Sequence, residues 1–534
     1  MKAKKKLKLK KIYLHPVTAI ILLIALVIVL SAVLSFFEMQ ATYSTVNPVT
    51  NQLESNLVTV ENLLNYDGLK YMISNAARNF ISFTPLSTLL VALLGVSVAQ
   101  ATGLFDTFIK RHMVKLDNKK ITFLLIFLAT ISSLINDVGY VILIPLGAIL
   151  FMANGRNPLT GIIASFGGVA FGYGATIFVG SMEVNLIPAT TSAARLIDST
   201  SHISLTSNLF IIIATSVILS IVGTIVIEKI IAPRLGRYKE PKEFQEENKT
   251  VELEVINIEE EEQRKLETEL REKRGLRNAL IAGIIVLAIF VYSLIPGLPF
   301  SGLLLDMNET TYLGQVFGDN SYFQDGFTYM VSIFLLATGI AYGIGAKTIK
   351  NDKELFNKAG DYMKEIGTLI IMIFFVAQLT SIFRRTNIGT VILAWGANLI
   401  SNLSFTGIPL ILLVLLVIAV ANLFITTPLA KWTVLAPVVV PSLMQSNITP
   451  QFAQFILRAG DSMTKGITPL LAFFVIYLGY LNIYNPKKEK PITIRQAIAY
   501  VAPYGGIIAA TWVLITIGWY LIGLPIGPGV FPTA

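Results

Sequence analysis

Three ionisable residues stand close together in a segment that is otherwise apolar. They are Arg458, Asp461 and Lys465, within the stretch ILRAGDSMTKGITP at residues 456–469. An ionisable side chain at membrane depth costs about 2.5–3.5 kcal/mol on insertion scales, so such residues usually serve a function. The planar guanidinium of Arg458 suits a carboxylate and predicts binding of an anionic substrate. Asp461 is expected to bind Na⁺ or to carry H⁺. The alternative is a purely structural ion pair between Arg458 and Asp461.

Lys465 follows Asp461 by four residues, which is within one helical turn. An ammonium group at this point can occupy the place of a bound Na⁺ beside the carboxylate. This interpretation favours coupling to H⁺ over coupling to Na⁺. The alternative is that Lys465 extends to an aqueous vestibule and has no part in coupling.

The first half of the chain carries polar residues in comparable surroundings. Glu183 and Asn185 lie in VGSMEVNLIP, and Asn136 and Asp137 lie in SSLINDVGY. We expect Glu183 to take part in ion coupling and Asn185 to contact substrate. Asn136 and Asp137 either cap helix ends or coordinate a cation, and a Na⁺ site near Asn136 and Asp461 is the one metal site that the sequence suggests.

Trp432, in TTPLAKW, is the corresponding feature of the second half. It is predicted to stack on an aromatic or cationic ligand. A single tryptophan of this kind otherwise serves as an anchor at the membrane interface.

The composition indicates which class of protein holds these residues in place. Of the 534 residues, 54% are hydrophobic and only 14% are charged, and long apolar runs recur. This pattern predicts an all-α polytopic membrane protein. The chain has no cysteine and three histidines, and it lacks nucleotide-binding and zinc-binding motifs. The sequence therefore predicts no cofactor, no enzymatic activity and no nucleic-acid partner.

The apolar runs predict nine transmembrane helices and two re-entrant helical hairpins. Lys and Arg are concentrated in alternate loops, which predicts a cytoplasmic N-terminus, an external C-terminus and a multi-pass protein of the inner (plasma) membrane. Three regions follow: a first membrane half at 1–228, a charged cytoplasmic insert at 229–277 and a second half at 278–534. The expected spans are about 17–37, 84–105, 159–200, 206–228, 278–296, 327–343, 366–383, 451–484 and 497–523, with hairpins at 121–153 and 408–446.

The two halves share a pattern when the sequence is shifted by about 292 residues. The matched pairs are Pro145 with Pro437, Pro158 with Pro450, Gly168 with Gly460, Gly174 with Gly466, and Tyr140 with Trp432. Since the hairpins are expected to enter from opposite sides, this pattern predicts an inverted-topology repeat, whose sites lie at hairpin tips and helix breaks near the midplane. Gly460 and Gly466 are expected to permit unwinding, and Pro469 to begin the next half-helix.

Several stretches resemble the p-aminobenzoyl-glutamate transporter (AbgT) family. They are NLFITTPLAKWTVLAPVVVP, ITPQFAQFILRAGDSMTKGITPLLAF, NFISFTPLSTLLVALLGVSVAQATGL, NDVGYVILIPL and TNIGTVILAWGA, and they follow the family's order over nearly the whole chain. The resemblance implies a homodimer with nine transmembrane helices and two hairpins per protomer. It also implies transport of folate precursors and, for some members, proton-driven export of sulfonamides.

The resemblance carries over to individual positions. The family's motif residues fall on Trp432, Pro450, Arg458 and Asp461, and its acidic residue in the first-half break, usually Asp, is Glu183 here. Asn387, in TNIGTVILAWGA, joins Arg458, Trp432, Pro450 and Asn185 as a substrate-binding candidate. Two departures bear on substrate and sodium use, since Leu429 replaces a hydroxyl residue and Lys465 replaces an Asn.

These features together predict an ion-coupled secondary transporter that works by alternating access. The expected cargo is p-aminobenzoyl-glutamate or a similar compound, or an exported sulfonamide, with H⁺ favoured over Na⁺. The alternative is another small carboxylate or dicarboxylate on the same fold. A membrane-embedded enzyme or receptor would need a catalytic dyad or a folded soluble domain, and neither pattern is present in the sequence.

Overall fold

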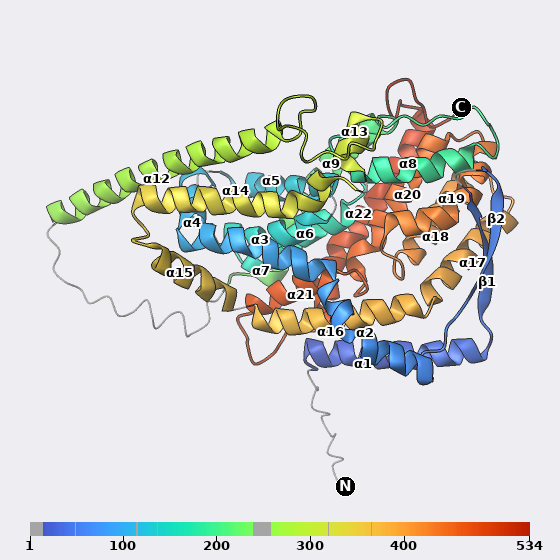
Figure 1. Ribbon diagram of the computed structural model, residues 1–534, viewed down its shortest axis with the longest axis horizontal. Coiled ribbons are helices and arrows are strands. Elements are labelled where there is room, and N and C mark those ends of the chain that lie inside the picture. The colour runs from blue at the N-terminus through green and yellow to red at the C-terminus, as the bar shows by residue number, and fades with distance from the viewer. Residues whose placement is uncertain are drawn as a thin grey trace, which may run out of the picture.

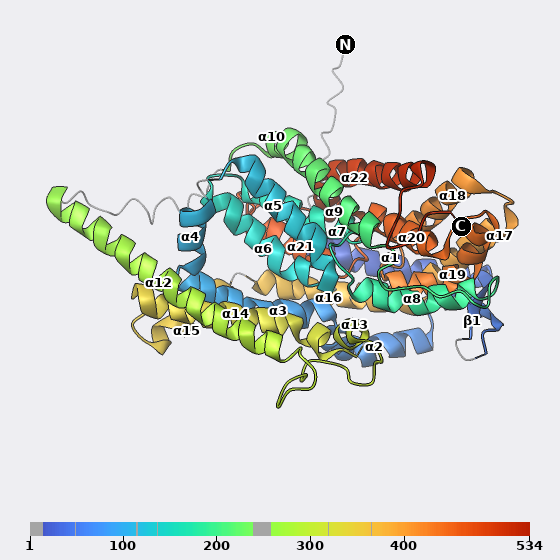
Figure 2. The ribbon, with the colours of Figure 1, turned by 90° about the horizontal axis from the view of Figure 1, so that it is seen from above.

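The computed structural model describes residues 14–47, 50–113, 116–135, 137–238, 258–318, 320–364 and 366–533. Helices make up nearly all of the regular structure, and one antiparallel β-hairpin accompanies them (Figure 1). Most long helices run roughly along the longest axis of the molecule, as both views show (Figures 1 and 2). The predicted all-α membrane architecture is confirmed.

The first half begins with a long apolar helix and the β-hairpin, which the sequence analysis did not predict. Strand β1 pairs with β2 from Gln40 opposite Thr59 to Val46 opposite Leu53. The elements are α1 (Pro16–Phe36), β1 (Gln40–Val46), β2 (Leu53–Thr59), α2 (Tyr66–Ile81), α3 (Thr84–Ala101), α4 (Leu104–Phe108), α5 (Asn118–Ile131), α6 (Val138–Ala153), α7 (Pro158–Phe171), α8 (Ser181–Ala194), α9 (Leu209–Val226) and α10 (Ala232–Leu235).

The second half begins with a 35-residue helix that continues from the charged insert into an apolar segment. The elements are α12 (Ile258–Tyr292), α13 (Tyr312–Phe317), α14 (Tyr322–Ala346), α15 (Asp352–Lys364), α16 (Gly367–Arg385), α17 (Ile388–Asn402), α18 (Gly407–Ala421), α19 (Pro428–Gln445), α20 (Pro450–Thr464), α21 (Phe474–Ile483) and α22 (Ile494–Ile522). The boundary expected at residue 277 therefore falls inside a continuous helix.

Eight helical segments in the described part of the chain are long and apolar enough to cross a membrane. They are 16–36, 66–101, 118–135, 209–235, 263–292, 322–346, 367–385 and 494–522. Five shorter apolar helices accompany them, namely α6, α7, α17, α18 and α21. Several of these belong to the expected hairpins and broken helices, whose halves are each shorter than a full span.

The two expected hairpins lie on opposite sides of the middle of the long axis (Figure 1). The hairpin of α5 and α6 lies in the half that also holds α4, whereas that of α18 and α19 lies in the half that holds the β-hairpin (Figure 1). Each is followed by a broken helix, α7 and α8 in the first case and α20 and α21 in the second. The tips and breaks thus come together in the middle of the molecule.

Prolines set the start of several of these helices. Pro16, Pro85, Pro158, Pro428 and Pro450 each lie in the first turn of a helix, where the missing N–H carries no cost. Pro158 and Pro450, which the 292-residue shift aligns, begin the corresponding helices α7 and α20. The two prolines that the shift aligns thus have the same position at a helix start, and the repeat itself stays a prediction.

Two details of the predicted break in the second half are wrong. Gly460 lies inside α20 and not in unwound chain. Its lack of a side chain allows close packing instead, since a Cβ at this position would lie 2.8 Å from Ile418. Unwinding begins at Lys465, where a short 3-10 turn follows α20. Helix α21 begins at Phe474, so Pro469 lies within the unwound segment and does not begin the next helix.

Candidate substrate and ion site

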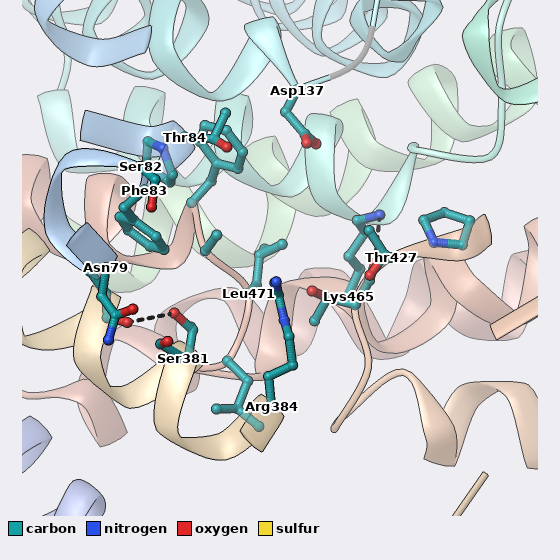
Figure 3. A pocket seen from close by; sticks show the side chains of 18 of the residues that line it. Asn79, Ser82, Phe83, Thr84, Asp137, Ser381, Arg384, Thr427, Lys465 and Leu471 are labelled. Carbon is teal, nitrogen blue, oxygen red and sulfur yellow. Dashed lines mark hydrogen bonds between the residues drawn. The ribbon is translucent and has the colours of Figure 1, made fainter. Parts of the chain in front are cut away.

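A cavity of about 400 Å³ lies where the hairpin tips and the helix breaks meet. Its lining comes from the junction of α2 and α3, the last turns of α16, both hairpin tips and both unwound segments. Figure 3 shows Asp137, Arg384 and Lys465 around the same space. The lining residues used below are Asn79, Ser82, Phe83, Asp137, Tyr173, Thr380, Ser381, Arg384, Thr426, Thr427, Lys465, Leu470 and Phe473.

Asp461 lies directly behind this cavity and shares its carboxylate between two ammonium groups. Lys431 contacts its Oδ1, and Lys465 Nζ lies 3.3 Å from its Oδ2. All three side chains are buried, with exposed fractions of 0 to 2%. Asn422 completes the cluster, since its Nδ2 donates to the Asp461 carbonyl at 2.6 Å and its Oδ1 accepts from Lys431. Both carboxylate oxygens are thus already matched by positive charge.

Lys465 also forms part of the cavity wall. Its Nζ lies 3.3 Å from the ring centroid of Tyr173 and donates to the carbonyl of Thr426 at 3.3 Å. A cation over an aromatic face is stabilised by the ring quadrupole. The ammonium is therefore held by three elements at once: its own helix end, the first-half break and the second hairpin tip.

Arg458 and Glu183 form a second buried ion pair, which joins the two halves of the chain. Arg458 Nε also donates to the carbonyl of Gly174 at 2.8 Å, and the Gly174 N–H donates to Ser462 at the same distance. Glu183 in turn accepts from the Gly180 N–H at 2.8 Å, at the start of α8. The alternative in which Arg458 pairs with Asp461 is wrong. Arg458 is not among the residues that line the cavity.

Trp432 lies in the first turns of α19 and is fully buried. Its indole N–H donates to Thr190 of α8 at 2.7 Å, so it joins the second hairpin to the first half. Pro450 begins α20, and Asn185 is half-buried on α8. None of these three residues lines the cavity, and their predicted contacts with substrate stay predictions.

Asp137 and Asn387 are the two remaining candidates that the structure describes. Asp137 lies at the tip of the first hairpin, immediately before α6, and lines the cavity. Asn387 precedes α17 and lines a second cavity of about 440 Å³ beside the first. Asn136 lies outside the described residues. In the described ranges, no three His, Asp or Glu side chains gather in a way that would hold a metal ion.

The sequence matches a known family model from residue 9 to residue 533, and the model's description is "AbgT putative transporter family". The chain belongs to the AbgT family. The p-aminobenzoyl-glutamate transport protein of Escherichia coli (strain K12) is 30% identical over 519 residues, which cover 97% of this chain and 94% of that protein.

Two solved AbgT-type structures are also similar to this chain. The YdaH transporter of Alcanivorax borkumensis is 28% identical, with 96% of this chain and 100% of that chain covered and a TM-score of 0.47. MtrF of Neisseria gonorrhoeae, whose structure is described as illuminating a class of antimetabolite efflux pumps, is 30% identical, with 98% of each chain covered and a TM-score of 0.47. The AbgT family consists of transport proteins, so this chain is a multi-pass membrane transporter and not an enzyme.

Three residues of this AbgT site were not among the sequence-derived candidates. Lys431 and Asn422 contact Asp461, and Arg384 lines the cavity. A signal existed for Lys431, since it stands beside Trp432 in the motif AKW. Arg384 and Arg385 directly follow an apolar run, where a basic pair usually marks the membrane interface.

Proposed function

We propose that this chain is a secondary active transporter that carries p-aminobenzoyl-glutamate, or a closely similar anionic aromatic amide, in exchange with or together with H⁺. The cargo is supported by membership of the AbgT family and by the curated E. coli relative, whose name states this substrate. The position of the cavity between hairpin tips and broken helices supports alternating access.

The cavity lining suits two parts of such a cargo, namely its aromatic ring and its amide group. Phe83, which is partly exposed in the cavity wall, offers an aromatic face for the aminobenzoyl ring. Ser82 and Thr427 offer hydroxyl groups that can donate to or accept from the amide. A sulfonamide shares the aromatic amine and an ionisable group, so export of sulfonamides uses the same lining.

The choice of H⁺ as the proposed coupling ion rests on the two lysines that contact Asp461. Lys431 and Lys465 already contact its two carboxylate oxygens in buried surroundings. A Na⁺ ion at this carboxylate would lie beside two ammonium charges, and like charges repel strongly where water is excluded. A proton can instead be taken up or released by the cluster without displacing either lysine. This supports H⁺ as the coupling ion.

A small dicarboxylate without an aromatic ring is the second candidate cargo. It is favoured by the two cationic side chains, Arg384 and Lys465, in the cavity wall. We further propose, from the distribution of Lys and Arg, that the protein lies in the inner membrane with a cytoplasmic N-terminus and an external C-terminus. From membership of the AbgT family we propose that it is a homodimer.

Counterflow in proteoliposomes tests the cargo and the coupling ion together. Labelled p-aminobenzoyl-glutamate is exchanged against unlabelled p-aminobenzoate conjugates, dicarboxylates or sulfonamides, and pH and Na⁺ gradients are then imposed separately. We expect exchange of p-aminobenzoyl-glutamate, and accumulation that responds to the pH gradient. Exchange of dicarboxylates alone would overturn the aromatic cargo. Accumulation driven by Na⁺ at constant pH and membrane potential would overturn H⁺ coupling.

A further inference from the structure

Arg384 is a cation in the cavity wall whose guanidinium has no partner among the described residues. It lies in the last turn of α16 and is exposed toward the cavity (Figure 3). No hydrogen bond or ion pair of its side chain occurs in the described part of the chain. An arginine in such a position keeps all five N–H donors available for a ligand.

The neighbouring Arg385 shows the opposite situation. Its Nε lies 3.0 Å from a carboxylate oxygen of Glu61, and its guanidinium lies 5.8 Å from the ring centroid of Tyr71. It faces a different depression, next to the end of the β-hairpin. The two adjacent arginines therefore differ in partner and location, although they share one helix end.

Arg384 also lies at the junction of two cavities. The 400 Å³ cavity and the 440 Å³ cavity share five lining residues, and Arg384 is the one charged residue among those five. The shared residues are Thr380, Arg384, Thr426, Thr427 and Leu470. An extended ligand that reached from one cavity into the other would pass this guanidinium.

The charges around the cavity do not cancel without a ligand. Arg458 is matched by Glu183, and Asp461 together with Asp137 matches Lys431 and Lys465 in number. Among the described residues around the cavity, Arg384 is the cation that remains. Because Arg384 is exposed to the cavity and has no carboxylate partner among the described residues, its guanidinium is free to form a charge-assisted pair with an anionic ligand.

We propose that Arg384 binds one carboxylate of the cargo, through a bidentate pair between that carboxylate and its guanidinium. This rests on the proposed function, in which the cargo is an anionic aromatic amide. Arg458, the sequence-derived candidate for this role, has its charge matched by Glu183 behind the cavity. The side chains of Ser82, Ser381 and Thr427 lie around the same space and can contact the remaining polar groups of the cargo (Figure 3).

Substitution of the two neighbouring arginines provides a matched test. Arg384→Gln and Arg384→Lys are compared with Arg385→Gln in the full-length protein, in proteoliposomes. The probes are labelled p-aminobenzoyl-glutamate, glutarate and p-aminobenzoyl-glutamine, in which an amide replaces the side-chain carboxylate. Half-saturating concentrations are measured by counterflow, and protein folding is checked by size-exclusion chromatography in detergent.

We expect Arg384→Gln to raise the half-saturating concentration of carboxylate probes about 10- to 100-fold, as for a charge-assisted pair worth about 1.4–2.7 kcal/mol. Arg384→Lys should recover part of this loss, since it keeps the charge but not the planar fork. Arg385→Gln should leave the value unchanged. If Arg384 pairs with the side-chain carboxylate, p-aminobenzoyl-glutamine should respond much less to Arg384→Gln than p-aminobenzoyl-glutamate does.

The outcomes separate this proposal from the proposed function. If the unmutated protein carries glutarate but no p-aminobenzoyl conjugate, the proposed cargo fails, and the effect of Arg384→Gln on glutarate still decides the role of Arg384. Equal half-saturation in Arg384→Gln and the unmutated protein overturns the proposal. Equal losses in Arg384→Gln and Arg385→Gln also overturn it, because the effect would then come from the helix end and not from this guanidinium.

Discussion

Glu183→Gln removes the charge that compensates a fully buried arginine. The side chains of Arg458 and Glu183 are 0% and 2% exposed, so neither charge can be hydrated without rearrangement. The guanidinium has few other partners: its Nε contacts the Gly174 carbonyl at 2.8 Å, and its Nη2 is buried without a hydrogen bond. Breaking a buried pair from one side costs about 3–5 kcal/mol. We therefore expect a loss of this size in the free energy of unfolding.

Denaturant titration in detergent micelles, followed by tryptophan fluorescence, measures this loss. Glu61→Gln is the matched control, because Glu61 pairs with Arg385 at 3.0 Å but the two side chains are 37% and 53% exposed. An exposed pair of this kind contributes at most about 1 kcal/mol. The two glutamate variants make the same chemical change, so the difference between them reports burial.

A double variant identifies the cause of the loss. Glu183→Gln combined with Arg458→Met removes both charges, and replacement of a buried pair by apolar groups is often neutral. We expect the double variant to be more stable than Glu183→Gln alone. If it is not, hydrogen bonds and not the unpaired charge account for the loss, since the double variant also removes the donor to the Gly174 carbonyl. A loss below about 1 kcal/mol in Glu183→Gln itself would refute the reasoning about the buried pair.

Three further predictions concern the same region. Asp461→Asn leaves Lys431 and Lys465 without their shared carboxylate, so accumulation driven by a pH gradient should be lost while counterflow persists; gradient-driven accumulation that survives would move the coupling role to Glu183. Lys465→Asn should introduce or strengthen Na⁺ stimulation of uptake at constant pH and potential, and an unchanged response would show that Lys465 does not replace the ion. Gly174→Ala would place a Cβ 2.6 Å from the Arg458 carbonyl, whereas Gly506→Ala meets nothing within 4 Å; the first should lower thermal stability and transport, and the second should change stability by no more than about 1 kcal/mol.

Hydropathy and proline positions were sufficient to predict most of the helical architecture. Lipid requires that backbone groups be satisfied within helices, so long apolar runs have few other structures available. The β-hairpin at 40–59 was missed because its polar, alternating residues resemble an ordinary external loop. Helix α12 was divided at residue 277 because its charge changes there, although its backbone continues unchanged.

The partners of the buried charges were much harder to predict. Arg458 and Asp461 are close in sequence, which suggested an ion pair between them. Arg458 instead pairs with Glu183, which is 275 residues away. Lys431 is 30 residues from Asp461 and reaches it only because α19 and α20 pack together. Because Arg458 pairs with Glu183 and both side chains are buried, Arg458→Ala is expected to destabilise the fold as well as to affect transport. Pairing depends on tertiary packing, which spacing along one helix does not contain.

The charge inventory around the cavity also constrains how cargo and ion combine. Among the described residues in and behind the cavity wall, and with every group in its usual ionised form, there are four cations and three carboxylates. The cations are Arg384, Lys431, Arg458 and Lys465, and the carboxylates are Asp137, Glu183 and Asp461. A cargo with one negative charge makes the occluded site neutral, whereas a dianion such as p-aminobenzoyl-glutamate leaves one negative charge in excess. Occlusion removes water and makes that excess costly, so one proton taken up with the dianion restores neutrality. A monoanionic cargo needs no such proton. The coupling to H⁺ that we propose would therefore depend on the charge of the cargo as much as on the lysines at Asp461.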